Sequence, residues 1–474
     1  MIGVLALTAL LLLPTDSAET PHYGLPINAD GRLTSHHLLY THCSEEQISE
    51  IREIGAALHE LVPMDEELAL LSTGKEPSVC TLVRLVKGMQ VEHLRYPLPE
   101  KIFRYDSTQS PESLREWVAS HCFEAEVGLV NQGSKDLQLL WLDTDGQHKD
   151  LGVLGPGEVN TRWMTSYLGH RFEVVDPDSQ QVLAAITVES DGFYVVGDKP
   201  APVVVDKEFL DQLEERVEMT VMDEWNKSRR VKRTFTGLGF SKGRLPYDLY
   251  ASMSAYYYNN RDRMMREEWG NKGLFVNWWE VDARMIGMPW GLKKYWQGRL
   301  KKLVEEWAGV SLSLTDIYGM RQYEEGARLL MHVDRQNTHA ASLIVNIAQI
   351  GMKQPWMLQI YDFADRMHEV DMEPGDIVYY ESARCLHGRM RPLNGTAYIN
   401  LFAHYQPMED GAGDPQWYTK PNPPGTPKPI LDFDNVCSID ETAAGAFKSC
   451  GGKKATSGID IFDFWQGGAA ATST

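Results

Sequence analysis

The chain has 474 residues, of which 43% are hydrophobic, and it carries a formal net charge of −20. This length and apolar content support two to four domains with cores of their own and exclude a largely disordered chain. Because no basic block exists beyond the short cluster from Lys227 to Arg233, we expect no nucleic-acid partner. An acidic exterior favours basic or neutral polypeptide substrates, although solubility explains it about as well.

The first 18 residues have the pattern of a secretory signal peptide. An apolar run from Met1 to Leu13 precedes a stretch of small residues that ends at Ala18. The run is too short to span a bilayer, and no later stretch is apolar enough to do so. Six cysteines fit an oxidising compartment. We therefore predict a signal peptide over residues 1–18, no membrane span, and a place in the secretory pathway, in the endoplasmic reticulum lumen or outside the cell.

Residues 20–118 follow, and their pattern favours helices. Ser44 and Gln47 are spaced as a capping box, and Ile48, Ile51 and Leu58 then recur at helical spacing. We predict a mostly helical N-terminal region that carries no recognisable chemistry.

Residues 122–198 change to the polar and apolar alternation that is typical of strands, with turns rich in Gly, Asp and Pro. This pattern predicts a small antiparallel β-sandwich.

Three strings stand out in this segment: Leu140-Trp-Leu-Asp-Thr-Asp-Gly146, Leu154-Gly-Pro-Gly157 and Thr165-Ser-Tyr-Leu-Gly-His-Arg-Phe172. Through them this part of the chain resembles the β-domain of the von Hippel-Lindau tumour-suppressor protein. That domain binds peptides that contain hydroxyproline. The resemblance therefore implies a peptide-binding pocket formed by Trp141, Ser166 and His170.

Two positions depart from that pocket. Phe172 stands where it has a tryptophan, and Leu151 stands where it has a tyrosine that hydrogen-bonds the ligand. Loss of such a hydroxyl costs about 1 to 3 kcal/mol in a buried site. The alternative, in which Trp141, Ser166 and His170 only hold the sandwich together, therefore stays open.

Residues 206–310 carry apolar stripes at helical spacing, such as Val217, Val221 and Trp225, and later Trp296 and Leu300. We predict helices that support a neighbouring sheet and do not bind a cofactor.

Residues 311–408 contain a series of short strand-like runs that are separated by turn residues such as Gly351, Pro374-Gly-Asp376 and Leu393-Asn-Gly395. The expected strands are Ala341–Ile347, Trp356–Tyr361, His368–Asp371, Ile377–Tyr380, Cys385–Arg391 and Ala397–Tyr405. Such a sheet, folded back on itself, is a jelly roll, also called a double-stranded β-helix. The expected class is thus α+β and mostly β in two functional domains, the jelly roll and the small antiparallel sandwich, with helical segments around them.

His332, Asp334 and His387 are the candidate metal ligands and catalytic residues. Residues i and i+2 of a strand face the same side, so His332 and Asp334 both turn inward. His387 lies on the penultimate strand, which a jelly roll brings to the same place. Two imidazoles and one carboxylate on one face of a metal leave the opposite face open, as in non-haem Fe(II) oxygenases. The alternative is an ordinary ion pair beside a core histidine.

Four motifs follow one another in this region: Tyr318-Gly-Met-Arg-Gln-Tyr-Glu-Glu-Gly326, His332-Val-Asp334, the Pro374-Gly-Asp376 turn and Tyr380-Glu-Ser-Ala-Arg-Cys-Leu-His387. Through them roughly residues 315–408 resemble the catalytic domain of prolyl 4-hydroxylase-type, 2-oxoglutarate-dependent dioxygenases. This resemblance implies Fe(II) on the three ligands, 2-oxoglutarate, O2 and usually ascorbate. It also implies hydroxylation of a protein or peptide side chain, first of all proline, with lysine or another residue as the alternative.

One departure concerns the cosubstrate. Members of this family usually carry a Lys or Arg about ten residues beyond the distal histidine, where it binds the distal carboxylate of 2-oxoglutarate, but this chain has Gly395-Thr-Ala397 there. Arg389 and Arg391 share a strand face with His387, and a guanidinium suits a carboxylate. We predict Arg389 or Arg391 as the anchor, with Tyr323 as a hydroxyl donor. Neutralisation of carboxylates such as Glu381 is the alternative role for both arginines.

Two functions remain open. The first is a dioxygenase whose sandwich recognises its substrate or product, with Pro-rich chains as one substrate. The second is a hydroxyproline-peptide binding protein whose barrel no longer binds 2-oxoglutarate. The complete triad favours the enzyme, and no pattern indicates an oligomeric state.

Residues 409–474 form a Pro-rich spacer and tail, in which the segment from Gly458 to Trp465 either docks on the body or binds a partner. Among the cysteines, we pair Cys437 with Cys450 and expect Cys385 to be a buried free thiol.

Overall fold

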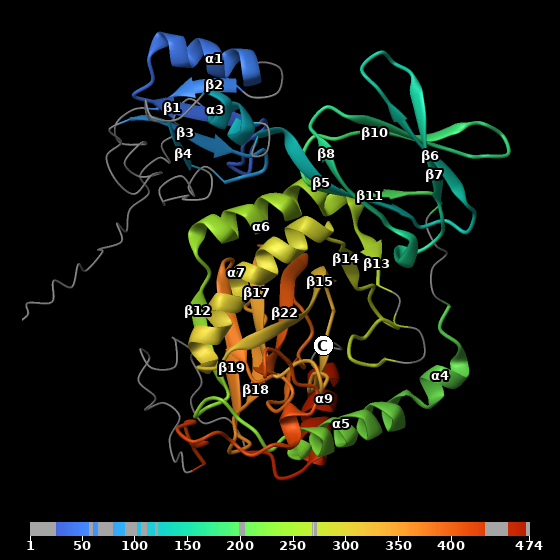
Figure 1. The fold of residues 1–474 in the computed structure, drawn as a ribbon. Coiled ribbons are helices and arrows are strands. Elements are labelled where there is room, and N and C mark those ends of the chain that lie inside the picture. Colours follow the sequence, from blue (N-terminus) through green and yellow to red (C-terminus); the bar gives the residue numbers. More distant parts are fainter. Residues whose placement is uncertain are drawn as a thin grey trace, which may run out of the picture.

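The computed structural model (Figure 1) describes residues 25–55, 60–64, 79–90, 102–105, 111–118, 122–198, 204–267, 269, 273–431 and 454–470. These residues form a mixed α and β protein in which strands predominate and most strand pairs are antiparallel. The expectation of an α+β chain that is mostly β is therefore confirmed.

The C-terminal half is built on two sheets, which we call the larger and the smaller barrel sheet. The larger sheet has the order β12-β20-β17-β22-β15-β14-β13. Its strands are β12 (Phe240–Arg244), β13 (Met265–Arg266), β14 (Arg284–Ile286), β15 (Leu312–Glu324), β17 (Ala341–Ile350), β20 (Asp376–Tyr380) and β22 (Ala397–Glu409), and β23 (Ala412–Gly413) pairs with β22. The smaller sheet, in the order β16-β21-β18-β19, holds β16 (Leu329–His332), β18 (Leu358–Tyr361), β19 (Met367–Val370) and β21 (His387–Arg389).

The barrel strands lie close to the positions that the sequence predicts, because the turns between them are encoded locally. In the β18–β19 turn, the Asp362 carboxylate accepts hydrogen bonds from the backbone N–H groups of Ala364 and Arg366, and Asp365 adopts a left-handed conformation with φ 62°. Such turns set the register of the strands on either side.

Two helices, α6 (Tyr247–Asn260) and α7 (Trp290–Ala308), lie along the larger sheet (Figure 1). Trp296, Leu300 and Val304 of α7 are fully buried in the same core cluster as Leu343 and Leu401 of the sheet. The apolar stripe predicted for this helix therefore faces the core.

The smaller sheet is covered by α5 (Leu213–Arg230), which follows α4 (Lys207–Asp211), and by α9 (Gly458–Ala470). Val217 and Val221 of α5 share a buried cluster with Leu330 of β16 and Trp465 of α9. The buried Arg328 guanidinium donates to the Trp465 carbonyl and lies 3.4 Å from the centroid of the Trp465 ring. The tail segment therefore docks on the body of this chain.

The N-terminal unit is a four-stranded sheet in the order β2-β1-β3-β4, in which β1 and β2 are parallel and the other pairs antiparallel. Its elements are β1 (His37–Thr41), α1 (Glu45–Gly55), β2 (Glu60–Pro63), β3 (Cys80–Leu85), β4 (Ile102–Tyr105) and α3 (Pro111–Val118). The expectation that residues 20–118 are mostly helical is therefore wrong for the described part. Strand β3 is buried at every position, so it shows no alternation that reveals a strand.

The capping box at the start of α1 is confirmed. The Ser44 backbone N–H donates to Gln47 Oε1 over 2.8 Å, and the Gln47 backbone N–H donates to Ser44 Oγ over 3.2 Å.

Residues 122–198 form a two-sheet sandwich with the orders β10-β9-β6-β7 and β11-β5-β8. Its strands are β5 (Glu124–Asn131), β6 (Leu137–Leu142), β7 (His148–Leu154), β8 (Arg162–Tyr167), β9 (Arg171–Val175), β10 (Val182–Thr187) and β11 (Gly192–Val196). Alternate residues such as Val127, Leu139 and Val174 fill the core between the sheets. The pair β11 and β5 is parallel, which departs from the purely antiparallel expectation.

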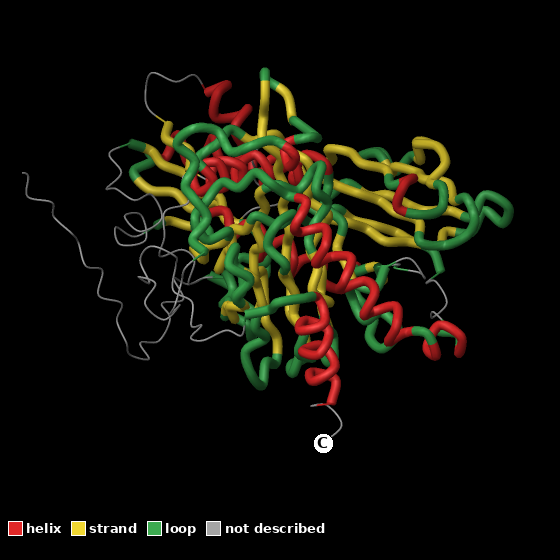
Figure 2. Tube along the Cα trace, turned by 90° about the horizontal axis from the view of Figure 1, so that it is seen from below, coloured by secondary structure: helices red, strands yellow, loops and turns green. Residues whose placement is uncertain are grey.

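Helix α6 connects the three units. Arg32 of the N-terminal unit donates to Ser254 Oγ, and Asn260 Oδ1 accepts from the Phe193 backbone N–H of the sandwich. Nearly every face of α6 is buried, which explains why its sequence lacks an amphipathic stripe. In Figures 1 and 2 the N-terminal sheet and the sandwich lie on opposite sides of the molecule.

Short 3-10 turns complete the fold: η4 (Glu158–Asn160), η5 (Arg261–Arg263) and η7 (Trp417–Thr419). Among the described residues, no helix is both long and apolar enough to cross a membrane. The predicted signal peptide and the pairing of Cys437 with Cys450 fall outside the described residues. Cys43 and Cys80 form a disulfide that the sequence does not predict, whereas Cys385 is a buried free thiol, as expected.

Candidate metal centre and its cavity

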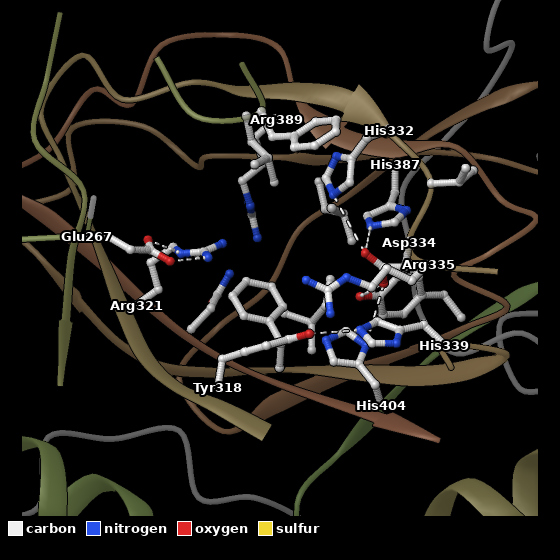
Figure 3. A pocket seen from close by; sticks show the side chains of 18 of the residues that line it. Glu267, Tyr318, Arg321, His332, Asp334, Arg335, His339, His387, Arg389 and His404 are labelled. Atoms are coloured by element: carbon white, nitrogen blue, oxygen red, sulfur yellow. Dashed lines mark hydrogen bonds and ion pairs between the residues drawn. The ribbon is translucent and has the colours of Figure 1, made fainter. Parts of the chain in front are cut away.

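A cavity of about 340 Å³ lies between the two barrel sheets (Figure 3). Its wall contains side chains from β15 and β22 of the larger sheet and from β16 and β21 of the smaller one, including Arg321, Asn400, His332 and His387. A concave pocket with several polar groups pointing inward is the usual form of a small-molecule site.

His332, Asp334 and His387 converge on the wall of this cavity. One donor atom from each lies within 4.8 Å of the others. His332 Nε2 is 3.8 Å from Asp334 Oδ1, and His387 Nε2 is 4.0 Å from the same oxygen. β16 ends at His332, and Asp334 lies just past it, where its backbone N–H donates to the Ser382 carbonyl. The predicted trio therefore meets, although only one of the first two ligands lies in the strand.

Each histidine has its tautomer set by the backbone. His332 Nδ1 lies 2.7 Å from the Leu330 carbonyl oxygen, and His387 Nδ1 lies 2.9 Å from the Cys385 carbonyl oxygen. A carbonyl only accepts, so each Nδ1 carries the proton and each Nε2 offers its lone pair to the shared space. This is the second contact that metal-binding histidines make.

The protonation states also suit a metal ion. Burial, assisted by the neighbouring His387, lowers the pKa of His332 to about 4, and burial also lowers the pKa of His387. Burial alone raises the pKa of Asp334, but the surrounding imidazoles, led by His404, outweigh it and hold that pKa below its ordinary value. At neutral pH the three groups are two neutral imidazoles and one carboxylate, the forms that bind a divalent metal.

A glycine allows the two ligand strands to approach. His332 and His387 are direct partners across β16 and β21. Between His387 and Arg389 stands Gly388, where a Cβ atom would lie 2.8 Å from the Leu329 carbonyl oxygen. Any side chain here would push the strands apart and separate the two imidazoles.

Arg389 is a fully buried cation in the wall of the cavity. Its side chain is among the largest fully buried ones, lines the cavity, and donates to the Trp356 carbonyl and to Tyr398 Oη. The guanidinium also stacks over the Trp356 and Tyr398 rings. Within the described residues it has no carboxylate partner, although a buried charge without a counter-ion is costly. An anion bound in the cavity would remove that cost.

The other two predicted cosubstrate residues do not line the cavity. Arg391 is 58% exposed and pairs with Glu369 over 3.3 Å, so it neutralises a surface carboxylate. Tyr323 is fully buried, with its ring 5.1 Å from that of Trp356. Their assignment to 2-oxoglutarate is corrected here: Arg391 lies past the end of β21, in a bend that faces the surface, and Tyr323 packs behind the cavity wall, where its hydroxyl oxygen accepts from Arg321.

Sequence reasoning missed several cavity residues. His339 and His404 stack with ring centroids 3.9 Å apart, and His404 Nδ1 lies 3.5 Å from Asp334 Oδ2. Arg321 is held by two hydrogen bonds to Glu267, so its charge is already balanced. A signal existed for β22, because Asn400, Phe402 and His404 are spaced by two and share one strand face.

The three predicted peptide-binding residues of the sandwich lie together. Ser166 Oγ is 3.1 Å from His170 Nδ1, and the ring centroids of Trp141 and His170 are 5.4 Å apart. The Trp141 indole N–H has no hydrogen-bond partner among the described residues. Phe172 is buried in the sandwich core.

No protein-family model matches the chain, and no curated protein matches it. The solved structures similar to it include a prolyl-4-hydroxylase from Pseudomonas putida, with 15% identity over 41% of this chain and 100% of that one, at a TM-score of 0.28. A prolyl hydroxylase from Trichoplax adhaerens, in complex with a hypoxia inducible factor oxygen degradation domain peptide, has 13% identity over 42% of this chain and 94% of that one, at 0.28. HygX from Streptomyces hygroscopicus, solved with nickel and 2-oxoglutarate bound, has 11% identity over 36% of this chain and 84% of that one, at a TM-score of 0.27.

Proposed function

We propose that the chain is an Fe(II)- and 2-oxoglutarate-dependent dioxygenase that hydroxylates a protein side chain. The observation that carries this proposal is the convergence of His332, Asp334 and His387 within 4.8 Å on the cavity wall, where, among the described residues, neither Nε2 atom makes a hydrogen bond. Two imidazole nitrogens and a carboxylate are the donor set of ferrous oxygenases.

The strand order supports a double-stranded β-helix for this unit. From β15 to β22 the chain passes repeatedly between the two sheets, and only β18 and β19 are consecutive in one of them. Each sheet therefore pairs early strands with late ones, as in the pairs β15 with β22 and β16 with β21. That interleaving brings His387 beside His332.

The chain's own residues bind and orient the reactants. His332, Asp334 and His387 hold the ion, and Arg389 binds the distal carboxylate of 2-oxoglutarate, while Phe275 and Trp269 help to exclude water from the cavity. Together, the metal, 2-oxoglutarate and O2 supply the oxidising power that converts C–H into C–OH, with succinate and CO2 as co-products. Ascorbate is the proposed reductant that keeps the ion ferrous.

For the substrate we propose peptidyl proline, with lysine or another residue as the alternative. The sandwich would then bind the hydroxylated product through Trp141, Ser166 and His170, whose proximity supports a shared pocket. The Cys43–Cys80 disulfide supports the proposed place in the secretory pathway, because disulfides persist in oxidising compartments.

The test is to add Fe(II) and 2-oxoglutarate to the full chain under anaerobic conditions and to record the visible difference spectrum. A weak charge-transfer band that requires both additions is the expected result. If no band forms although peptides containing hydroxyproline bind, the chain is the alternative hydroxyproline-binding protein with an altered barrel. The buried Arg389 argues against that alternative, because a barrel without a dicarboxylate ligand gains nothing from a buried cation.

A further inference from the structure

An open groove of about 520 Å³ leads away from the cavity. Phe275, Val333, Asp334 and Arg335 line both the cavity and the groove, so the groove meets the cavity at the proposed metal ligand Asp334. The far part of the groove is formed by the last turns of α5 and by the segment around Tyr418. A polymer that presents one side chain to the metal would therefore lie along this groove.

The net charge of the side chains that line the groove is opposite in sign to the net charge of the whole chain. Glu224 is buried and already neutralised, because it pairs with Lys227 and also accepts a hydrogen bond from the Val333 backbone N–H. The Asp334 carboxylate faces the metal position. Within the part of the chain that the structure describes, no ion pair joins Arg230 or Arg335 to a carboxylate. The groove is therefore locally cationic on a chain with net charge −20.

The two arginines are well placed to contact a bound chain. Arg335 lines both hollows, and Figure 3 shows its side chain reaching into the cavity beside Asp334. Arg230 lies in the last turn of α5, where its neighbour Arg229 is instead bound to Asp365 over 2.7 Å. Arg335 therefore lies at the inner end of the groove, beside the cavity, and Arg230 lies at its outer end.

The remaining wall suits a polypeptide. Asn337 and Gln416 offer amide groups that hydrogen-bond a peptide backbone, and Phe275 and Tyr418 offer aromatic faces for apolar side chains such as a proline ring.

We propose that the substrate is a peptide segment with acidic residues beside the hydroxylated position, one of which pairs with Arg335 and another, farther along, with Arg230. This inference rests on the proposed function and specifies its substrate class. It reverses the expectation of basic or neutral substrates that the overall charge suggests, because a local field at the site guides a ligand more strongly than distant, screened charges.

The test measures fluorescence anisotropy of labelled peptides on the full chain. Three short peptides carry a central proline and differ only in the flanking residues, which are glutamate, glutamine or lysine. We expect the glutamate peptide to bind roughly tenfold more tightly than the glutamine peptide and the lysine peptide to bind most weakly. The preference should shrink as salt is added.

Reversing the charges of the two groove arginines tests whether they cause the preference for the glutamate peptide. The double variant Arg230→Glu with Arg335→Glu should lose the preference for glutamate, whereas replacing both arginines with lysine should keep most of it. Arg52→Glu is the matched control, because Arg52 is an exposed helical arginine on α1, outside the groove. Equal binding of the three peptides overturns the proposal, as does a preference that survives the double reversal or falls equally in the control.

Failure of this inference can be told apart from failure of the proposed function. Succinate release that all three peptides stimulate equally keeps the dioxygenase and overturns the acidic-substrate inference. A charge preference in binding that depends on Arg230 and Arg335, without any peptide-stimulated succinate release, keeps the groove assignment and overturns the enzyme.

Discussion

His332 and His387 are cross-strand partners on β16 and β21, with ring centroids 4.4 Å apart, and each ring contacts the carbonyl of the residue two positions earlier in the chain. The backbone, and not a mobile side chain, therefore orients both rings. A donor set held in this way is preorganised for a metal, since little side-chain freedom is lost when the ion binds.

Replacement of either ligand histidine should abolish metal binding and activity. In His332→Ala or His387→Ala, one donor of a three-residue site is missing, and we expect the affinity for Fe(II) and the rate of succinate release to fall by roughly 100-fold or more. Metal titration followed by the anaerobic difference spectrum measures the first quantity, and a succinate assay measures the second.

His148→Ala is the matched control for these variants. His148 is half exposed on the sandwich and pairs with Glu173 over 2.8 Å, so its removal should leave both metal affinity and succinate release unchanged. Full metal binding by His332→Ala would show that the triad is an ordinary ion-pair cluster.

Arg389 should determine the affinity for 2-oxoglutarate. Arg389→Gln removes the buried cation that faces the cavity, and we expect the KM for 2-oxoglutarate to rise by about 100-fold, consistent with the loss of a desolvated ion pair. Arg391→Gln, just past the end of β21, removes the surface pair with Glu369 and the contact with the Phe464 ring, both outside the cavity, and should change that KM less than about twofold. Similar effects in both variants would place the anchor elsewhere.

Much of the two-sheet C-terminal unit is predictable because its signals are local. The strands from β17 to β22 are bounded by turn residues, and the spacing of His332 and Asp334 indicates a shared face. The N-terminal sheet is not predictable in this way, since β1 pairs with β3 across more than forty residues and β3 is buried throughout. Pairing at such distance depends on tertiary packing, which local periodicity does not encode.

In the candidate site, too, local sequence patterns predict some residues, whereas others depend on tertiary structure. The triad follows from residue type and spacing, but the choice between Arg389 and Arg391 depends on where one short strand ends, since β21 stops at Arg389. His339 and Glu267 come from loops, so no periodicity places them in the cavity. The same holds for the groove, which is assembled from α5, the loop after β16 and the segment around Gln416.

The sandwich should prefer hydroxyproline to proline. In the proposed pocket, Ser166 and His170 hydrogen-bond the 4-hydroxyl group, so a labelled peptide with hydroxyproline should bind more tightly than the same peptide with proline. Ser166→Ala should reduce that preference by roughly tenfold, the effect of one lost hydrogen bond at a partly buried site. Isothermal titration of both peptides against the full chain measures the ratio.

Ser134→Ala is the control for the sandwich, because Ser134 is an exposed serine in the turn between β5 and β6 of the same unit. Equal affinity for the two peptides in the unaltered chain would leave Trp141, Ser166 and His170 with a structural role only.

Glu381 should make the stability of the barrel depend on pH. Burial raises the pKa of Glu381 to about 7 in the folded chain, although hydrogen bonds from Thr236 and Phe235 oppose this. The folded state therefore keeps the proton more firmly than the unfolded state, whose pKa is near 4.5. The resulting penalty is absent below about pH 4.5, grows as the pH rises to about 7, and stays constant above it, reaching on the order of 3 kcal/mol.

Glu381→Gln removes this titration while keeping a carbonyl oxygen that can accept from the backbone N–H groups of Phe235 and Thr236. Thermal unfolding midpoints between pH 5 and pH 8 should therefore fall more steeply in the unaltered chain than in the variant, and the variant should gain most at pH 8. Parallel pH profiles for the two proteins would mean that Glu381 is ionised in the folded state throughout this range.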